Sequence, residues 1–288
     1  MMRIISAIMT RLSRSGMKAF ELAKAGAKKT LLRLLESRGS GVVWQGDYPS
    51  WEAALQACGD NGYAADNILQ KTLASTLKVK NGEAVFERDS CLFDKIAYSF
   101  PLLACLFKVA AECGNRLSVV DFGGALGSHY FQNRDFLRPV EIEKWVVVEQ
   151  TKHVEAGTRF IAEGPLSFAP VLESVGNVNL LLSSSTLQYL DRPYDYARRF
   201  ADSGIEYILL DRLAVNVEPR DRLTIEVVPP RIYEARYPSW FLHEEKVLDI
   251  FKEKYELLLD FDSLIDKANV PSVYRGYLFK RKKTKSNG

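Results

Sequence analysis

The sequence has no apolar run that approaches the roughly 18 residues needed to span a bilayer, and its N-terminus lacks the pattern of a secretory signal. It also has few cysteines: four among 288 residues, at positions 58, 91, 105 and 113, without the spacing of a zinc site. We therefore expect a cytoplasmic protein with free thiols and no metal centre. No internal repeat or low-complexity segment is evident, which argues against a repeat architecture.

The chain has little net charge, +3, but its basic residues are concentrated towards the two ends. Residues 1–38 contain nine Lys or Arg against two Glu, and residues 280–285 add five basic side chains, so the middle is acidic. This distribution argues against a nucleic-acid partner, because nucleic-acid-binding domains are basic over the surface that binds. Residues 1–38 are expected to form a basic amphipathic helical arm. This arm either makes peripheral contact with the inner face of an anionic membrane or is a solvated arm that packs on the protein.

The apolar (47%) and charged (26%) fractions are those of an ordinary globular protein, and the length suits one α/β domain with additions. Residues 39–114 are expected to form a helical cap, with helices at 51–58, 65–76 and 92–113. Residues 115–288 are expected to form the ligand-binding domain, in which strands and helices alternate. The expected strands are 117–122, 144–149, 159–168, 178–184 and 205–211, and the expected helices lie near 127–137, 169–175 and 192–203. Unbroken apolar strands indicate a parallel sheet that is buried on both faces.

Residues 213–242 contain four prolines and are expected to be irregular. The aromatic side chains of this stretch, among them Tyr233, Tyr237 and Trp240, either form a lid over a bound acceptor or pack the loop against the protein. A helix at 243–254 and two strand-like runs at 255–261 and 272–280 are expected to follow.

A glycine-rich turn follows the first expected strand. Asp121 ends the strand, and Gly123, Gly124 and Gly127 precede a helix-like segment. Glycine allows a positive φ and lets the backbone come close to a ligand, and a helix N-terminus presents unpaired N–H groups. Such a turn forms a crevice at the carboxyl end of a strand, where open α/β sheets bind nucleotide-like ligands.

Glu149 ends the next expected strand. A carboxylate at this place can accept hydrogen bonds from both hydroxyls of a ribose, although it can also be an exposed acid at a strand end. NAD is a rival ligand for the same residues. A dinucleotide site prefers the spacing G-x-G-x-x-G near the start of its domain, whereas the spacing here is Gly-Gly-x-x-Gly, deep within the chain.

These residues resemble those of the class I S-adenosylmethionine-dependent methyltransferases. The matching segments are 119–127, Glu149 and 180–190. More narrowly, several short motifs look like those of a little-characterised bacterial methyltransferase family that is associated with surface-polysaccharide genes. These motifs are Trp51–Ala54, Glu87–Ser90, Leu187–Leu190, Leu210–Arg212 and Tyr237–Trp240. The resemblance implies an α/β, Rossmann-like sheet of seven strands, mostly parallel with an antiparallel last strand, and S-adenosyl-L-methionine as the cofactor.

The resemblance also implies roles for individual residues. The cofactor-binding residues would be Asp121, Gly123, Gly124, Gly127, Glu149, Ser167, Phe168, Ser184 and Ser185. The glycine turn would border the methionine part, with Asp121 supporting the turn or holding the amino group, and Glu149 would hold the ribose. Ser167 and Phe168 would lie beside the adenine, and the two serines at 184 and 185 would face the transferred methyl group. Ala125 stands where the family's alternate-glycine pattern has glycine, which makes the motif less specific.

Methyl transfer to oxygen or nitrogen can require a base. The candidate catalytic residues are His129, Asp211 and Tyr189, and the candidate acceptor-binding residues are Gln188, Arg212, Tyr233 and Trp240. Each has a structural alternative: the histidine can be satisfied by backbone or solvent, the tyrosine can belong to the core, and Asp211 with Arg212 can form a local ion pair.

The sequence therefore predicts an S-adenosylmethionine-dependent methyltransferase that acts on a small-molecule or glycan acceptor, with a role in surface-polysaccharide biosynthesis as the finer expectation. A non-catalytic accessory protein that binds the cofactor or a glycan is the first alternative, because no residue resembles an obligatory nucleophile. An NAD-dependent Rossmann enzyme is the second.

Overall fold

The computed structural model describes residues 41–59, 66–230, 232, 234–263 and 266–283. The expected N-terminal arm over 1–38 lies outside these residues. From Val42 onward the chain forms one compact unit, and the expected division into cap and ligand-binding domain at residue 114 stays a prediction. In the part of the chain that is described, no helix is both long and apolar enough to cross a membrane.

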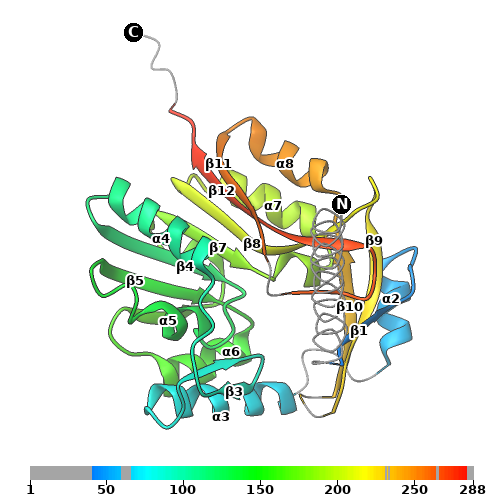
Figure 1. Ribbon diagram of the computed structural model, residues 1–288, viewed down its shortest axis with the longest axis horizontal. Helices are drawn as coiled ribbons and strands as arrows, with labels where there is room; N and C mark the ends of the chain where they lie inside the picture. The colour runs from blue at the N-terminus through cyan, green and yellow to red at the C-terminus, as the bar shows by residue number, and fades with distance from the viewer. Residues whose placement is uncertain (1–40, 60–65, 231, 233, 264–265, 284–288) are drawn as a thin grey trace, which may run out of the picture. The chain divides into compact units, whose positions relative to one another are not determined.

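A seven-stranded sheet forms the centre of the molecule (Figure 1). Its order is β11-β12-β8-β7-β4-β5-β6. The strands are β4 (Arg116–Phe122), β5 (Glu141–Val148), β6 (Leu166–Ala169), β7 (Leu180–Ser184), β8 (Tyr207–Asn216), β11 (Tyr255–Asp262) and β12 (Ser272–Arg281). The five strands from β6 to β8 are parallel, whereas β12 is antiparallel to both of its neighbours. The expectation of a mostly parallel sheet of seven strands with an antiparallel last strand is confirmed.

Both faces of the sheet are covered, which explains the unbroken apolar strands. Val119, Trp145 and Leu182 pack on one face with helix α4 (Phe100–Glu112) and the residues around α5 (Ser128–Asn133). Val120 and Leu181 pack on the other face with α7 (Pro193–Asp202) and α8 (Glu244–Lys252). Successive side chains of a strand point to opposite faces of the sheet, so the even and odd positions of each strand pack into the apolar clusters on different faces. Asp121 and Ser184, near the carboxyl ends of β4 and β7, and Asp211, where the pairing of β8 with β7 ends, consequently lie on the α4 face. Strand β8 itself continues to Asn216, beyond its expected end at 211.

A second, three-stranded antiparallel sheet stands beside helix α2 (Trp51–Cys58) in Figure 1. It consists of β1 (Val43–Gln45), β9 (Arg222–Val228) and β10 (Ala235–Phe241), with β9 in the middle. The expectation of an irregular stretch over 213–242 is therefore wrong. Pro238 lies in the edge strand β10, where a missing N–H breaks no ladder, and Pro229 and Pro230 lie between the two strands.

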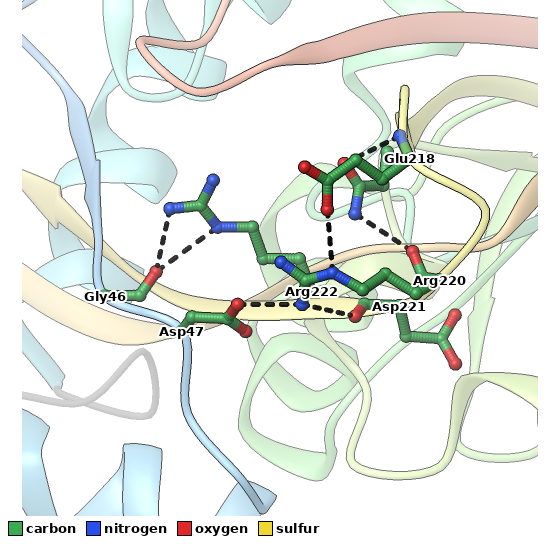
Figure 2. A network of polar contacts seen from close by, with 7 residues as sticks. Gly46, Asp47, Glu218, Arg220, Asp221 and Arg222 are labelled. Atoms are coloured by element: carbon green, nitrogen blue, oxygen red, sulfur yellow. Dashed lines mark hydrogen bonds and ion pairs between the residues drawn. The ribbon is translucent and has the colours of Figure 1, made fainter.

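A network of polar contacts joins the segment after β1 to the turn between β8 and β9 (Figure 2). Arg222 donates to the carbonyl oxygen of Gly46 at 3.2 and 3.4 Å. Arg220 donates to Asp47 and to Glu218, each at 2.8 Å. The segment that leads into α2 is thereby attached to the small sheet, which contacts α2 through a shared apolar cluster.

The region before β4 is not purely helical, contrary to expectation. It contains α3 (Asp66–Lys80), a hairpin of β2 (Phe86–Arg88) and β3 (Cys91–Phe93), and α4. Residues 92 and 93 are extended, and α4 begins only at Phe100, where the Ser99 side chain accepts the N–H of Leu102 and Pro101 occupies the first turn. Because β1 pairs with β9, this region also contributes a strand to the small sheet.

Three further elements differ from the expected ranges. The first helix after the glycine turn ends at Asn133, before the expected 137. The expected strand over 159–168 is replaced by α6 (Thr151–Ala156) and a π-helical turn, η1 (Gly157–Ile161), and only the short β6 follows. The expected helix over 169–175 is reduced to one 3₁₀ turn, η2 (Leu172–Ser174). The expected helices near 192–203 and 243–254 are confirmed as α7 and α8.

Candidate functional site

The turn between β4 and α5 is packed so closely that its glycines cannot carry side chains. A Cβ on Gly123 would lie 2.3 Å from the Thr186 methyl carbon, and the φ of this glycine is +75°. A Cβ on Gly124 would lie 2.5 Å from the carboxyl carbon of Asp121. Gly127, with φ +89°, is the N-cap of α5. Close packing at Gly123 and Gly124, and the positive φ of Gly123 and Gly127, therefore explain why glycine occupies these positions.

Glu149 lies directly after β5 and reaches this turn. Its carboxylate accepts the backbone N–H of Gln150 at 2.8 Å, and the nearby backbone N–H of Ala125 favours its ionised form. Burial raises the pKa of Glu149 to about 7 despite these hydrogen bonds. The structure thus brings together the two features from which the sequence predicted a ribose site.

Asp121 is fully buried below the turn. Its Oδ2 accepts the indole N–H of Trp145 at 3.1 Å and lies 3.3 Å from Nδ1 of His129. Its Oδ1 has no hydrogen-bond partner among the described residues. Burial by itself would lower the pKa of His129, but the neighbouring carboxylates of Asp121 and Asp211 outweigh it, and the pKa of His129 is raised.

Asp211 lies on the α4 side of β8, opposite Ser184 at the end of the pairing between β7 and β8, and is 2% exposed. Its Oδ2 accepts the Ser184 hydroxyl at 2.7 Å, while its Oδ1 has no hydrogen-bond partner in the described part of the chain. Burial raises the pKa of Asp211. Ser185 has a positive φ of 53°, and its backbone N–H donates to the main-chain oxygen of Asp211 at 2.9 Å.

Arg212 does not form the local ion pair with Asp211 that was weighed from the sequence. Its guanidinium donates to both carboxylate oxygens of Asp266, at 2.6 and 2.7 Å. Gln188 is 1% exposed, and its amide nitrogen donates to the Ser185 hydroxyl at 3.0 Å and to the main-chain oxygen of Arg212 at 3.1 Å. These residues therefore lie together at the carboxyl ends of β7 and β8.

The other predicted residues lie in different surroundings. The Tyr189 hydroxyl donates to Glu226 of the small sheet at 2.8 Å. Trp240 stacks on Trp51 with ring centroids 6.3 Å apart, and its indole N–H donates to the main-chain oxygen of Leu190. It therefore connects β10 to α2 and to the segment after β7. Tyr233 lies outside the described residues.

Ser167 and Phe168 occupy opposite faces of β6. Ser167 is exposed, whereas the Phe168 ring packs so closely on η1 that a Cβ on Gly157 would lie 2.6 Å from it. Their placement beside the adenine stays a prediction.

Two buried carboxylates in the same region were missed by sequence reasoning. Glu87 of β2 is 2% exposed and accepts the hydroxyl of Ser128, at the start of α5. Glu226 of β9 is 6% exposed and accepts the hydroxyls of Tyr189 at 2.8 Å and Tyr237 at 3.2 Å. Burial raises the pKa of each glutamate to about 7. The available signal was a glutamate inside an apolar strand-like run, which predicts a buried acid.

A surface pocket of about 350 Å³ lies elsewhere, between residues 172–178 and 199–205. These residues adjoin the amino ends of β7 and β8 and include none of the candidate site residues. Ligands of parallel α/β sheets bind at the carboxyl ends of the strands. The chemistry therefore belongs to the carboxyl edge rather than to this pocket.

The sequence matches no family model and no curated protein. Solved methyltransferase structures resemble the fold. N-methyltransferase NodS from Bradyrhizobium japonicum, in complex with S-adenosylhomocysteine, has a TM-score of 0.42 and 12% identity, and the match covers 74% of this chain and all (100%) of that one. The 1,6-didemethyltoxoflavin-N1-methyltransferase of Burkholderia thailandensis has a TM-score of 0.40 and 12% identity over 78% of this chain and 94% of that one. An S-adenosylmethionine-dependent methyltransferase from Clostridium acetobutylicum has a TM-score of 0.41 and 11% identity over 62% and 90%. By its own strand order and its antiparallel β12, this chain has the Rossmann-like fold of class I methyltransferases.

Proposed function

We propose that this protein is an S-adenosylmethionine-dependent methyltransferase that acts on a small or carbohydrate-linked acceptor. The observation that carries the proposal is the position of Glu149, which directly follows β5 beside the glycine turn that follows β4, where the N–H of Gly123 donates to the main-chain oxygen of Val148 at 2.9 Å. Glu149 would thus present a ribose-binding carboxylate beside a glycine turn at the carboxyl ends of adjacent parallel strands.

The residues present fit the cofactor. The free Oδ1 of Asp121 is a buried acceptor that can receive the ammonium group of the methionine part, and the Glu149 carboxylate can accept both ribose hydroxyls. When bound, the cofactor supplies an electrophilic methyl group on a sulfonium. The protein then has to align the acceptor with that methyl group and exclude water.

Asp211 and His129 are the proposed proton acceptors. Asp211 is buried and His129 is partly buried, and each influences the pKa of the other. Asp211 keeps one carboxylate oxygen free of hydrogen bonds, while Ser184 fixes the other. A raised pKa brings a carboxylate closer to the range in which it can take a proton from a substrate at neutral pH.

The rival dinucleotide interpretation fits the sheet less well. A dinucleotide-binding sheet is built from two parallel mononucleotide halves, whereas here the antiparallel β12 lies between β8 and β11. We further propose that the protein is cytoplasmic and that it takes part in surface-polysaccharide biosynthesis. The biosynthetic role rests on the sequence resemblance alone.

The test is calorimetric titration of the protein with S-adenosylmethionine, S-adenosylhomocysteine and NAD. We expect the two sulfur ligands to bind and NAD not to bind, and failure of both sulfur ligands would reject the proposal. A turnover screen with sugar nucleotides and small acceptors then separates an enzyme from an accessory binding protein. Asp211→Asn should abolish the formation of S-adenosylhomocysteine during turnover, but it should still bind S-adenosylhomocysteine that is added. The exposed control Asp202→Asn should leave both turnover and binding unchanged.

A further inference from the structure

Several buried oxygens at the carboxyl edge of the sheet have no hydrogen-bond partner among the described residues. Besides Asp121 Oδ1, they include Glu87 Oε2, Asp211 Oδ1 and Gln188 Oε1. Each belongs to a side chain that is at most 2% exposed. Carboxylate and amide oxygens can only accept hydrogen bonds, and a buried acceptor without a donor is costly. With Asp121 assigned to the cofactor, the remaining three oxygens call for a ligand that donates.

The same place gathers several carboxyl groups, and a bound cation would favour their ionised forms. We name Glu87, Asp89, Asp211, Glu226 and Asp266, together with Gln188, the acceptor cluster. Its members are within electrostatic reach of one another, since Asp89 acts on Glu87 and Glu226, and Asp266 acts on Glu226 and Asp211.

The cations near the cluster neutralise it only in part: His129 and Arg212 act on Asp211 without reaching ion-pair distance. The guanidinium of Arg212 is held by Asp266 in a two-bond fork. Arg88 acts on Asp266 from a distance and lies over the Phe93 ring. Among the described residues, Glu226 and Asp211 have no basic side chain within ion-pair distance. A neutral alcohol could satisfy the free oxygens but would leave these charges uncompensated, whereas an ammonium group meets both needs.

We propose that the acceptor cluster binds the methyl acceptor through an ammonium group, so that the substrate is an amine. This inference rests on the proposed function and names its substrate class. The Asp211 carboxylate takes one proton from the bound ammonium. The nitrogen lone pair then forms the N–C bond while the C–S bond breaks and leaves its electron pair on sulfur. The products are a methylated ammonium and S-adenosylhomocysteine.

The experiment compares matched amine and hydroxyl probes on protein saturated with S-adenosylhomocysteine. Glucosamine is paired with glucose, and diaminobutane with butanediol, and binding is followed by calorimetry. We expect at least one amine to bind at least tenfold more tightly than its hydroxyl partner. Asp211→Asn and Glu226→Gln should each remove this preference, while their affinity for S-adenosylhomocysteine shows that they are folded. Glu218→Gln, in the exposed turn between β8 and β9, is the matched control and should keep the preference.

The outcomes separate the two claims. If S-adenosylhomocysteine binds but no amine binds, or the hydroxyl probes bind equally well, the amine class is wrong and the proposed function stands. An unchanged preference in both cluster variants also rejects the assignment to this cluster. If S-adenosylhomocysteine itself does not bind to the wild type, the proposed function fails first.

Discussion

At the scale of single residues, Ala125 is the informative departure in the glycine turn. Its φ is +51°, in the left-handed region that glycine adopts without strain. A side chain there costs about 1–2 kcal/mol. The chain tolerates this cost at the position whose backbone N–H helps to favour the ionised form of Glu149. The strain therefore lies in the proposed cofactor site itself.

We expect Ala125→Gly to raise the free energy of unfolding by about 1 kcal/mol, because relief of the strained φ exceeds the added flexibility of the unfolded chain. Urea denaturation measures the change. Ala53→Gly in α2, where an ordinary helical residue is replaced, should lower the free energy of unfolding by about 1 kcal/mol. A loss of stability in Ala125→Gly would show that the turn does not store strain at this position.

At the scale of elements, Asp221 lies in the turn between β8 and β9 that Figure 2 shows, and it joins two helices to this turn. It accepts the Tyr194 hydroxyl of α7, the N–H of His243 at 2.8 Å, and the Lys246 ammonium of α8 at 2.9 Å. Its burial opposes ionisation, but these donors outweigh burial and lower the pKa of Asp221. One carboxylate thus connects the small sheet to the helical layer behind the large one.

Asp221→Ala should lower the free energy of unfolding by about 2–3 kcal/mol, because it leaves partly buried donors without an acceptor. Asp47→Ala, which removes only an exposed ion pair with Arg220, should cost no more than about 0.5 kcal/mol. Chemical denaturation of both variants tests the contrast. Equal losses would mean that Asp221 does not link the elements energetically.

The elements that the sequence predicted well are those whose pattern is set by burial on both faces. Strands β4, β5, β7 and β8 each contain a buried apolar run, and their neighbours in the sheet follow from the resemblance. The small sheet was missed because Pro229, Pro230 and Pro238 suggested an irregular loop. Edge position, which decides whether a proline is tolerated, depends on distant pairing with β1 and cannot be read locally.

The site was predicted in part for the same reason. Glu149 and Asp211 each follow a run of apolar residues, so topology alone placed them at one edge of the sheet, although β8 continues past Asp211. Glu87, Glu226 and Asp266 come from the hairpin, the small sheet and a late loop, and only tertiary structure shows that they are close to these strand ends. Arg212 was paired with its sequence neighbour, whereas its actual partner lies 54 residues away.

At the scale of the whole molecule, three glutamates with raised pKa values make stability depend on pH. Burial raises the pKa values of Glu87, Glu149 and Glu226 from 4.5 to about 7. The folded state then binds more protons than the unfolded state between these two values. Stability that is present below pH 4.5 is therefore lost as the pH rises towards about 7.

We expect the free energy of unfolding to fall between pH 5 and pH 7.5 by an amount on the order of 1 kcal/mol or more for each glutamate. In a variant that carries Glu87→Gln, Glu149→Gln and Glu226→Gln, this fall should be much smaller. Denaturation curves at the two pH values measure both. An equally steep fall in the variant would place the proton linkage on other groups.

Calorimetry shows directly whether Glu149 and the glycine turn bind the cofactor. S-adenosylhomocysteine is titrated calorimetrically into the wild type, Glu149→Ala and Glu143→Ala at pH 8, where the Glu149 carboxylate is ionised. Glu143 lies on the same strand and binds Arg116 and Ser118 away from the turn. The account predicts binding by the wild type and by Glu143→Ala, and affinity weakened by at least about tenfold in Glu149→Ala. Equal affinity in all three proteins, or no binding by the wild type, would contradict it.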